Sequence, residues 1–217
     1  MKTILRFLLL AVCCLGLFLL PAPAQAAPYA DDFFDDFNDG DMEGWGIWGP
    51  ATWTVENGEL VGALEQADGL AGISTGSVDW SNYVLEFEVT LDTGGLVGMG
   101  FRATDVRGYW LVLNVGTDTV NLGTSREGQG SYGLEAVDYA LSNGELYRVK
   151  IVMSSATLLI YVDDRFILQY IDPDPIMTGN ISLEANTLDS SPAIRVRYDN
   201  VRITHLDEQV YLPLLPN

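Results

Sequence analysis

Apolar and polar residues alternate along most of the chain after Asp35, in short runs bounded by Gly, Asn or Asp. A period of two indicates half-buried β-strands, and helical periodicity is absent. Strands without helices pack as two antiparallel sheets, so we predict an all-β, two-sheet jelly-roll sandwich. The predicted strands are 51–55, 59–63, 83–91, 96–103, 109–115, 119–123, 146–153, 157–162, 166–171, 179–185 and 193–204.

The chain opens with the three parts of a secretory signal peptide. Lys2 and Arg6 are basic, residues 7–20 are apolar, and Ala24-Gln25-Ala26 offers small residues at a cleavage site. The apolar run is too short to cross a bilayer core of ~30 Å as a helix. We therefore predict a secreted protein. Its predicted parts are a signal peptide at 1–26, a jelly-roll sandwich at 27–206 and a C-terminal tail at 207–217.

Both cysteines, Cys13 and Cys14, lie within the predicted signal peptide. The mature chain would then contain no disulfide, and the packing of its core has to stabilise it. Lipoprotein processing at one of these cysteines is the alternative. That processing needs a small residue before the cysteine, where this chain has Val12 or Cys13, so we favour secretion without a lipid anchor.

The chain is strongly acidic, with a formal charge of −19 that becomes −21 when residues 1–26 and their two basic side chains are removed. Such a surface opposes binding to nucleic acid and to anionic lipid. No later segment is apolar enough to span a membrane. The carboxylates either form a solvated surface or are available to divalent cations.

Several short motifs, most of them at turns and core positions, resemble those of one family. They are Phe37-Asn38-Asp39-Gly40, Gly44-Trp45, 53–60, 98–102, 108–110, 159–165 and 198–203. The chain resembles concanavalin A-like (laminin G-like) jelly-roll domains of secreted bacterial proteins, including 3-keto-disaccharide hydrolase-type domains. The resemblance implies this fold and places Trp45 and Trp53 in the core. Asp164 stands where the family usually has Gly, which affects a turn.

The central predicted strands share a polar face. Alternation puts Glu86 and Glu88 on one side of 83–91, with Arg102 and then Trp110 and Asn114 on the matching side of the next two strands. If these strands form successive hairpins, Arg102 lies about 5 Å from both Glu86 and Trp110.

An indole beside charged groups, with Gly98 and Gly100 leaving space, is suited to stacking against a sugar ring. We predict a ligand-binding site at Glu86, Arg102, Trp110 and Asn114. The alternative is a structural ladder stabilised by its own charge pairs. Trp48 and Trp80 lie in predicted loops and are weaker candidates for lining a groove.

No catalytic constellation stands out. Glu86 and Glu88 share a face of one strand, and carboxyls ~5–5.5 Å apart would suit a retaining glycosidase, so they are the candidate acid/base pair. The strand lacks the Glu-x-Asp-x-x-Glu pattern of a glucanase of this fold. His205 is the one histidine, which leaves little for a triad or a zinc site.

An acidic segment at the start of the domain offers oxygen ligands of the kind that Ca²⁺ prefers. Its spacing does not match an EF-hand loop. A structural Ca²⁺ at Asp35, Asp36, Asp39 and Asp199 requires the first and last strands to pair. The alternative is a solvated acidic leader, and we predict no required cofactor.

These observations favour a secreted carbohydrate-binding or adhesion-type module that contacts a glycan or polysaccharide on one sheet face. Two alternatives stay open. One is a glycoside hydrolase of the keto-disaccharide hydrolase type, which the resemblance permits. The other is a structural surface module without a small ligand.

Overall fold

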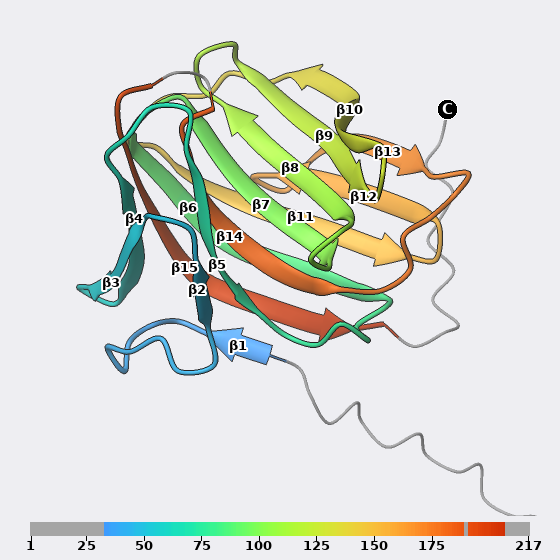
Figure 1. Ribbon diagram of the computed structural model, residues 1–217, viewed down its shortest axis with the longest axis horizontal. Helices are drawn as coiled ribbons and strands as arrows, with labels where there is room; N and C mark the ends of the chain where they lie inside the picture. The colour runs from blue at the N-terminus through green and yellow to red at the C-terminus, as the bar shows by residue number, and fades with distance from the viewer. Residues whose placement is uncertain (1–32, 189–190, 207–217) are drawn as a thin grey trace, which may run out of the picture. The chain divides into compact units, whose positions relative to one another are not determined.

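The computed structural model describes residues 33–188 and 191–206, which form fifteen strands and no helix (Figure 1). The predicted signal peptide and the predicted C-terminal tail lie outside the described residues. Sheet A has the order β13 (Arg165–Ile171), β12 (Thr157–Val162), β11 (Leu146–Ser154), β6 (Tyr83–Thr93), β15 (Ile194–His205), β4 (Glu59–Leu64) and β3 (Thr52–Glu56), and β1 (Phe33–Asp35) also pairs with β15. Sheet B has the order β10 (Gly130–Asp138), β9 (Thr119–Arg126), β8 (Gly108–Asn114), β7 (Leu96–Ala103), β14 (Asn180–Asn186), β5 (Leu70–Thr75) and β2 (Gly46–Trp48).

The two-sheet sandwich confirms the predicted fold class. All eleven predicted strands are present, with ends displaced by at most three residues. The prediction missed β1, β2, β5 and β10. The first two are three residues long, β5 contains a glycine, and β10 is exposed along most of its length, so none shows a clear alternation.

The core lies between the sheets and follows the predicted alternation. On β6, Tyr83, Leu85 and Phe87 are buried, while Glu86 and Glu88 point away from the core. Trp45 and Trp53 are 9% and 5% exposed, which confirms their predicted place in the core. Because the inner residues of both sheets meet here, apolar burial is the main stabilisation of the described domain.

The predicted hairpin between β6 and β7 is wrong. β6 pairs with β11 and β15 in sheet A, whereas β7 pairs with β8 and β14 in sheet B. The connection at Gly94, with a φ of 104°, therefore carries the chain from one sheet to the other. As a result, Glu86 does not lie across from Arg102.

Arg102 also departs from the predicted alternation, because its side chain is buried, with 0% exposure. Phe101 pairs with Ile181 and Ala103 with Asn180, so Arg102 is the extra residue of a β-bulge and has a φ of 44°. A bulge with a left-handed residue redirects a side chain to the other face of a strand. The predicted sugar contact at Arg102 is therefore wrong in its geometry.

The inward guanidinium of Arg102 binds loop backbone at one end of the sandwich. Its Nε donates to the Ser81 carbonyl at 2.9 Å, and Nη1 donates to the carbonyls of Ser155 at 2.7 Å and Ile176 at 3.0 Å. Nη2 donates to Oδ1 of Asn82 at 3.2 Å. Buried carbonyls need hydrogen-bond donors. Arg102 supplies these donors to three connections, which have no neighbouring strand to pair with.

Buried tyrosine hydroxyls connect the two sheets across the core. The Tyr198 hydroxyl, from β15 in sheet A, lies 3.0 Å from the Gly98 carbonyl and 2.8 Å from the Glu184 carbonyl in sheet B. The Tyr83 hydroxyl accepts a hydrogen bond from the Arg102 amide at 2.9 Å. Burial raises the pKa of both tyrosines, so each hydroxyl keeps its proton.

Within the described residues no helix has the length and apolar character that a membrane crossing requires.

We expect Arg102→Met to lower the free energy of unfolding by about 2–4 kcal/mol, because the carbonyls of Ser81, Ser155 and Ile176 lose a buried donor. Urea denaturation measures the change. Arg107→Met, in the exposed loop that follows, is the matched control and should stay within about 0.5 kcal/mol. Equal effects of the two substitutions would contradict the structural role of Arg102.

Candidate functional site

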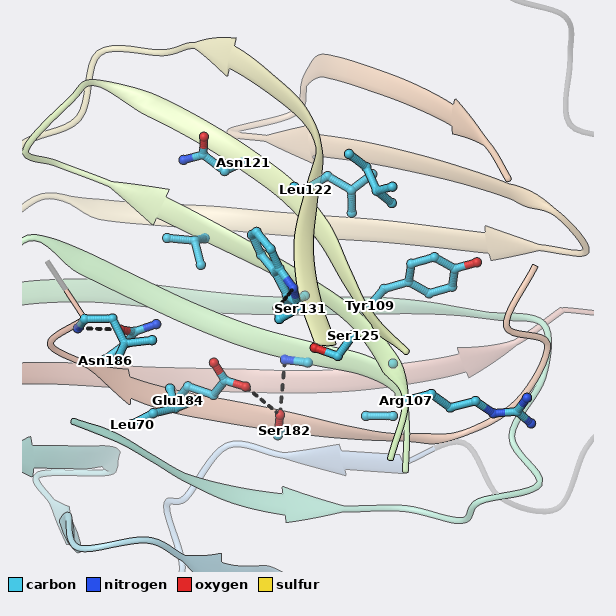
Figure 2. A pocket seen from close by; sticks show the side chains of 18 of the residues that line it. Leu70, Arg107, Tyr109, Asn121, Leu122, Ser125, Ser131, Ser182, Glu184 and Asn186 are labelled. Atoms are coloured by element: carbon cyan, nitrogen blue, oxygen red, sulfur yellow. Dashed lines mark hydrogen bonds between the residues drawn. The ribbon is translucent and has the colours of Figure 1, made fainter. Parts of the chain in front are cut away.

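A groove of about 1060 Å³ lies on the face of sheet B that points away from the core (Figure 2). Residues of β7, β8, β9 and β14 form its floor, while β10, β2 and the loop between β7 and β8 contribute its borders. This surface is called the sheet B groove below. This hollow therefore lies on one face of one sheet.

The floor of the sheet B groove is low because β7 carries Gly98 and Gly100 at its outward positions. A Cβ atom at Gly98 would collide with the Glu184 carboxylate, and one at Gly100 would lie 2.5 Å from the Ser182 hydroxyl. Both polar side chains belong to β14, the neighbouring strand. They lie over the glycines of β7, in space that a larger residue would occupy.

Glu184 and Ser182 form a polar pair at the centre of the floor. The Ser182 hydroxyl donates to Oε1 of Glu184 at 3.2 Å and accepts a hydrogen bond from the Gly100 amide at 3.1 Å (Figure 2). The carboxylate is thus held in place by one neighbour that is itself fixed to β7. Its second oxygen, Oε2, has no hydrogen bond or ion pair to another described residue.

Burial raises the pKa of Glu184 to about 7, although the hydrogen bond from Ser182 lowers it in part. The cause is desolvation, which penalises the ionised form of a carboxyl that has no cation beside it. A carboxyl that titrates near neutral pH can both accept and release a proton under physiological conditions. Glu184 is therefore the described groove residue best suited to acid/base chemistry.

Trp110 borders the polar pair on the β8 side. It is the cross-strand partner of Gly100 on one side and of Gly123 on the other. A Cβ atom at Gly123 would collide with the indole, so the ring lies over the β9 backbone. Its Nε1 donates to the Ser131 hydroxyl of β10 at 2.9 Å, which fixes the ring in this orientation.

Trp48 repeats this arrangement at the other border. A Cβ atom at Gly72 on β5 would collide with the Trp48 indole, which comes from the edge strand β2. Gly72 and Gly123 lie four strand spacings apart in sheet B, or roughly 19 Å at ~4.8 Å per strand. Two half-buried indoles thus lie on opposite sides of the polar pair.

The structure brings together two of the four predicted ligand-binding residues. Trp110 and Asn114 both line the sheet B groove. Glu86 lies on the outward face of sheet A, and Arg102 is inside the sandwich. A ligand-binding role of Trp110 and Asn114 stays a prediction, and the expected contact of Trp110 with Arg102 and Glu86 is wrong.

Glu86 and Glu88, the predicted acid/base pair, do share a face of β6. Arg148 donates to Oε1 of Glu88 at 2.9 Å, and Asn200 donates to its Oε2 at 3.1 Å. The hollow beside them is about 190 Å³, much smaller than the sheet B groove. A catalytic role for this pair stays a prediction.

The predicted calcium ligands are engaged in local hydrogen bonds. β1 does pair with β15, as that prediction required, with Asp35 opposite Val201. Asp35 accepts hydrogen bonds at 2.8 Å from the Phe37 amide and from the Trp45 indole.

Asp36 and Asp39 each accept a hydrogen bond from the amide two residues later, at 3.2 Å. Burial raises the pKa of Asp199, and nearby carboxylates such as Asp36 add to that shift. Among the described residues no group of three or more His, Cys, Asp or Glu side chains is placed to hold a metal ion. A calcium site at Asp35, Asp36, Asp39 and Asp199 stays a prediction.

The sequence prediction missed Glu184 and Ser182 as site residues and gave Trp48 little weight. In the predicted strand 179–185, alternation puts Glu184 on the polar side together with Asn180 and Ser182. The sequence therefore gives Glu184 no signal that separates it from an ordinary solvent-facing residue. Its neighbours could not be deduced, because β14 pairs with β7 across about 80 residues of chain.

A family model described as the 3-keto-alpha-glucoside-1,2-lyase-like domain matches residues 32–204. The chain belongs to this family. The match spans both sheets of the sandwich and includes every residue of the sheet B groove named above. No curated protein matches the sequence significantly.

Solved structures with the same fold resemble this lyase-like domain at low sequence identity. CBM66, a carbohydrate-binding module from Bacillus subtilis, is 20% identical with a TM-score of 0.62, covering 74% of this chain and 95% of that one. A Bacillus subtilis protein of unknown function with a galectin-like fold is 13% identical with a TM-score of 0.67, covering 80% and 94%. The VIP36 exoplasmic/lumenal domain, in a Ca²⁺/Man3GlcNAc-bound form, is 11% identical with a TM-score of 0.62, covering 83% and 90%.

We expect the stability of the lyase-like domain to depend on pH through Glu184. The folded protein holds this proton more tightly than an unfolded chain, where the ordinary pKa is 4.5. The resulting stabilisation is full below about pH 4.5 and is lost as the pH rises through about 7.

Replacement by Glu184→Gln should remove this dependence and raise the relative stability above pH 7 by about 1 kcal/mol or more. Urea denaturation across this pH range measures the difference. Glu86→Gln removes a carboxylate from the opposite sheet and is the control for loss of charge alone. A parallel pH profile for the Glu184→Gln and unmodified proteins would contradict the assignment.

Proposed function

We propose that the protein is a secreted carbohydrate-binding domain that holds a glycan in the sheet B groove. The observation that carries this proposal is the Trp110 indole, laid over Gly123 and fixed by Ser131, beside the Glu184 and Ser182 pair. A sugar ring has an apolar face and a rim of hydroxyls. The groove offers the matching surfaces side by side.

The two kinds of contact have different roles. Stacking on an indole removes apolar surface from water, and this provides most of the affinity. The carboxylate of Glu184 and the hydroxyl of Ser182 accept or donate hydrogen bonds and so orient the ring. Asn114, at the same face of β8, adds an amide to this set.

The length of the groove favours an oligosaccharide over a single sugar. Trp48 and Trp110 lie over strands roughly 19 Å apart, so a ligand that touches both needs several sugar units. The CBM66 carbohydrate-binding module and the Man3GlcNAc-bound VIP36 domain, which share this fold, support a glycan as the ligand. The apolar leader before the domain supports its secretion.

We expect Trp110→Ala to weaken binding on a glycan array at least about tenfold, because an aromatic anchor of this kind typically contributes more than ~1.4 kcal/mol. Trp48→Ala should weaken the binding of long oligosaccharides and spare that of short ones. Phe166→Ala is the control, because this ring is 40% exposed on sheet A.

Absence of signal on every glycan would contradict the proposed function and leave the structural surface module. The calcium prediction is tested by repeating the array with EDTA and by measuring the melting temperature with and without EDTA. A lower melting temperature together with unchanged glycan binding would make calcium structural.

A second candidate function is cleavage of a 3-keto-glucoside in the same groove. It is favoured by the family description together with the raised pKa of Glu184. The C3 ketone makes the proton on C2 acidic. The Glu184 carboxylate would take that proton. The electron pair of the broken C2–H bond would then form a C1=C2 double bond as the C1–O bond breaks. The leaving alkoxide takes a proton from water.

We expect turnover of a 3-keto-α-glucoside, if this function holds, to rise as the pH passes through about 7, because the base must be ionised. Glu184→Gln should lower turnover at least about a hundredfold, in the range of general base catalysis. The conjugated enone product is followed by its ultraviolet absorbance. Glu145→Gln, which removes an exposed carboxylate just before β11 of sheet A, is the control. A variant at Glu184 that keeps full turnover would exclude this mechanism.

A further inference from the structure

The centre of the sheet B groove holds a carboxylate that no cation of the described protein neutralises. Oε1 of Glu184 has the Ser182 hydroxyl at 3.2 Å, whereas Oε2 has no hydrogen bond or ion pair to another described residue. Oε2 lies over Gly98, where a Cβ atom would collide with it. One oxygen of a half-buried carboxylate therefore faces the space that a ligand would occupy.

The charges around the groove do not compensate for this carboxylate. The lining residues include the acidic Asp105, Glu135 and Glu184, and one base, Arg107. Figure 2 shows the Arg107 side chain extending toward the far end of the groove, away from Glu184. The whole chain, these residues included, has a formal charge of −19. The potential in the groove is thus negative, which attracts cations and repels anions.

Trp110 and this unpaired oxygen lie on either side of β8. Oε2 of Glu184 lies over Gly98 of β7, whereas the Trp110 indole lies over Gly123 of β9. These two strands are two spacings apart in sheet B, or roughly 10 Å at ~4.8 Å per strand. An oligosaccharide that stacks on Trp110 and extends over β8 therefore brings a substituent of a neighbouring sugar unit to the carboxylate.

We infer, on the basis of the proposed glycan-binding function, that the groove selects glycans built of amino sugars with free amines. One sugar ring stacks on Trp110, and the ammonium group of a neighbouring unit donates to Oε2 of Glu184. An ammonium group donates hydrogen bonds to the carboxylate and also supplies the counter-charge that the groove lacks. Water or a neutral hydroxyl supplies only the hydrogen bonds. Uronic acids and sulfated sugars place a second negative charge beside Glu184 and are excluded.

The test compares two ligands that differ only in the amine. Fully deacetylated and fully N-acetylated β-1,4-linked glucosamine oligomers of equal length are titrated into the protein by calorimetry near neutral pH. We expect the deacetylated oligomer to bind at least about tenfold more tightly. In Glu184→Gln the ratio of the two affinities should fall close to one, because the carboxamide has no charge.

Glu145→Gln is the matched control, since it removes one exposed carboxylate just before β11 of sheet A and should retain the ratio. Trp110-dependent binding without preference for the amine would overturn this inference and leave the proposed function standing. A preference that survives Glu184→Gln, or that falls equally in Glu145→Gln, would assign it to the general surface charge and also overturn the inference. If no oligomer or other glycan binds, the proposed function itself fails.

Discussion

The sheet B groove depends on the absence of side chains at four positions on three of its strands, β5, β7 and β9. Gly98 and Gly100 leave room for the polar groups of β14, while Gly72 and Gly123 let two indoles lie over the backbone. Any larger residue there would push these groups outward and fill the hollow. Glycines weaken a strand because they lose more backbone entropy on folding than other residues do, and because they have no side chain to pack against neighbours. The site is therefore built at a cost to the sheet that carries it.

Hydrogen bonds through the core offset part of that cost. The Tyr198 hydroxyl reaches from sheet A to the backbone of Gly98 and Glu184, on the inner side of the groove floor. At one end of the sandwich, Arg102 binds the carbonyls of three connections. Such contacts position β7 and β14 relative to sheet A without a disulfide. The orientation of Glu184 thus depends on buried groups that no ligand touches.

Alternation along the sequence was sufficient to predict eleven of the fifteen described strands and most of the faces that they bury, because these are local properties. It was not sufficient to predict which strands pair. β6 and β7 follow each other in the chain and look like a hairpin, yet they belong to different sheets. The bulge that turns Arg102 inward needs Ile181 and Asn180 as partners, and these come from a distant strand. Alternation placed Trp110 and Asn114 on one face because they share one strand, whereas the position of Glu184 beside them depends on the register of β14 against β7.

Binding and cleavage place opposite demands on the environment of Glu184. A base for proton transfer works best when its pKa lies near the working pH, which burial without a cation provides. An ammonium ligand would lower that pKa and remove the basicity. The same groove therefore cannot favour amino sugars and also abstract protons from them efficiently. A neutral 3-keto sugar would keep the carboxyl reactive, so the charge of the ligand decides between a binding site and a catalytic one.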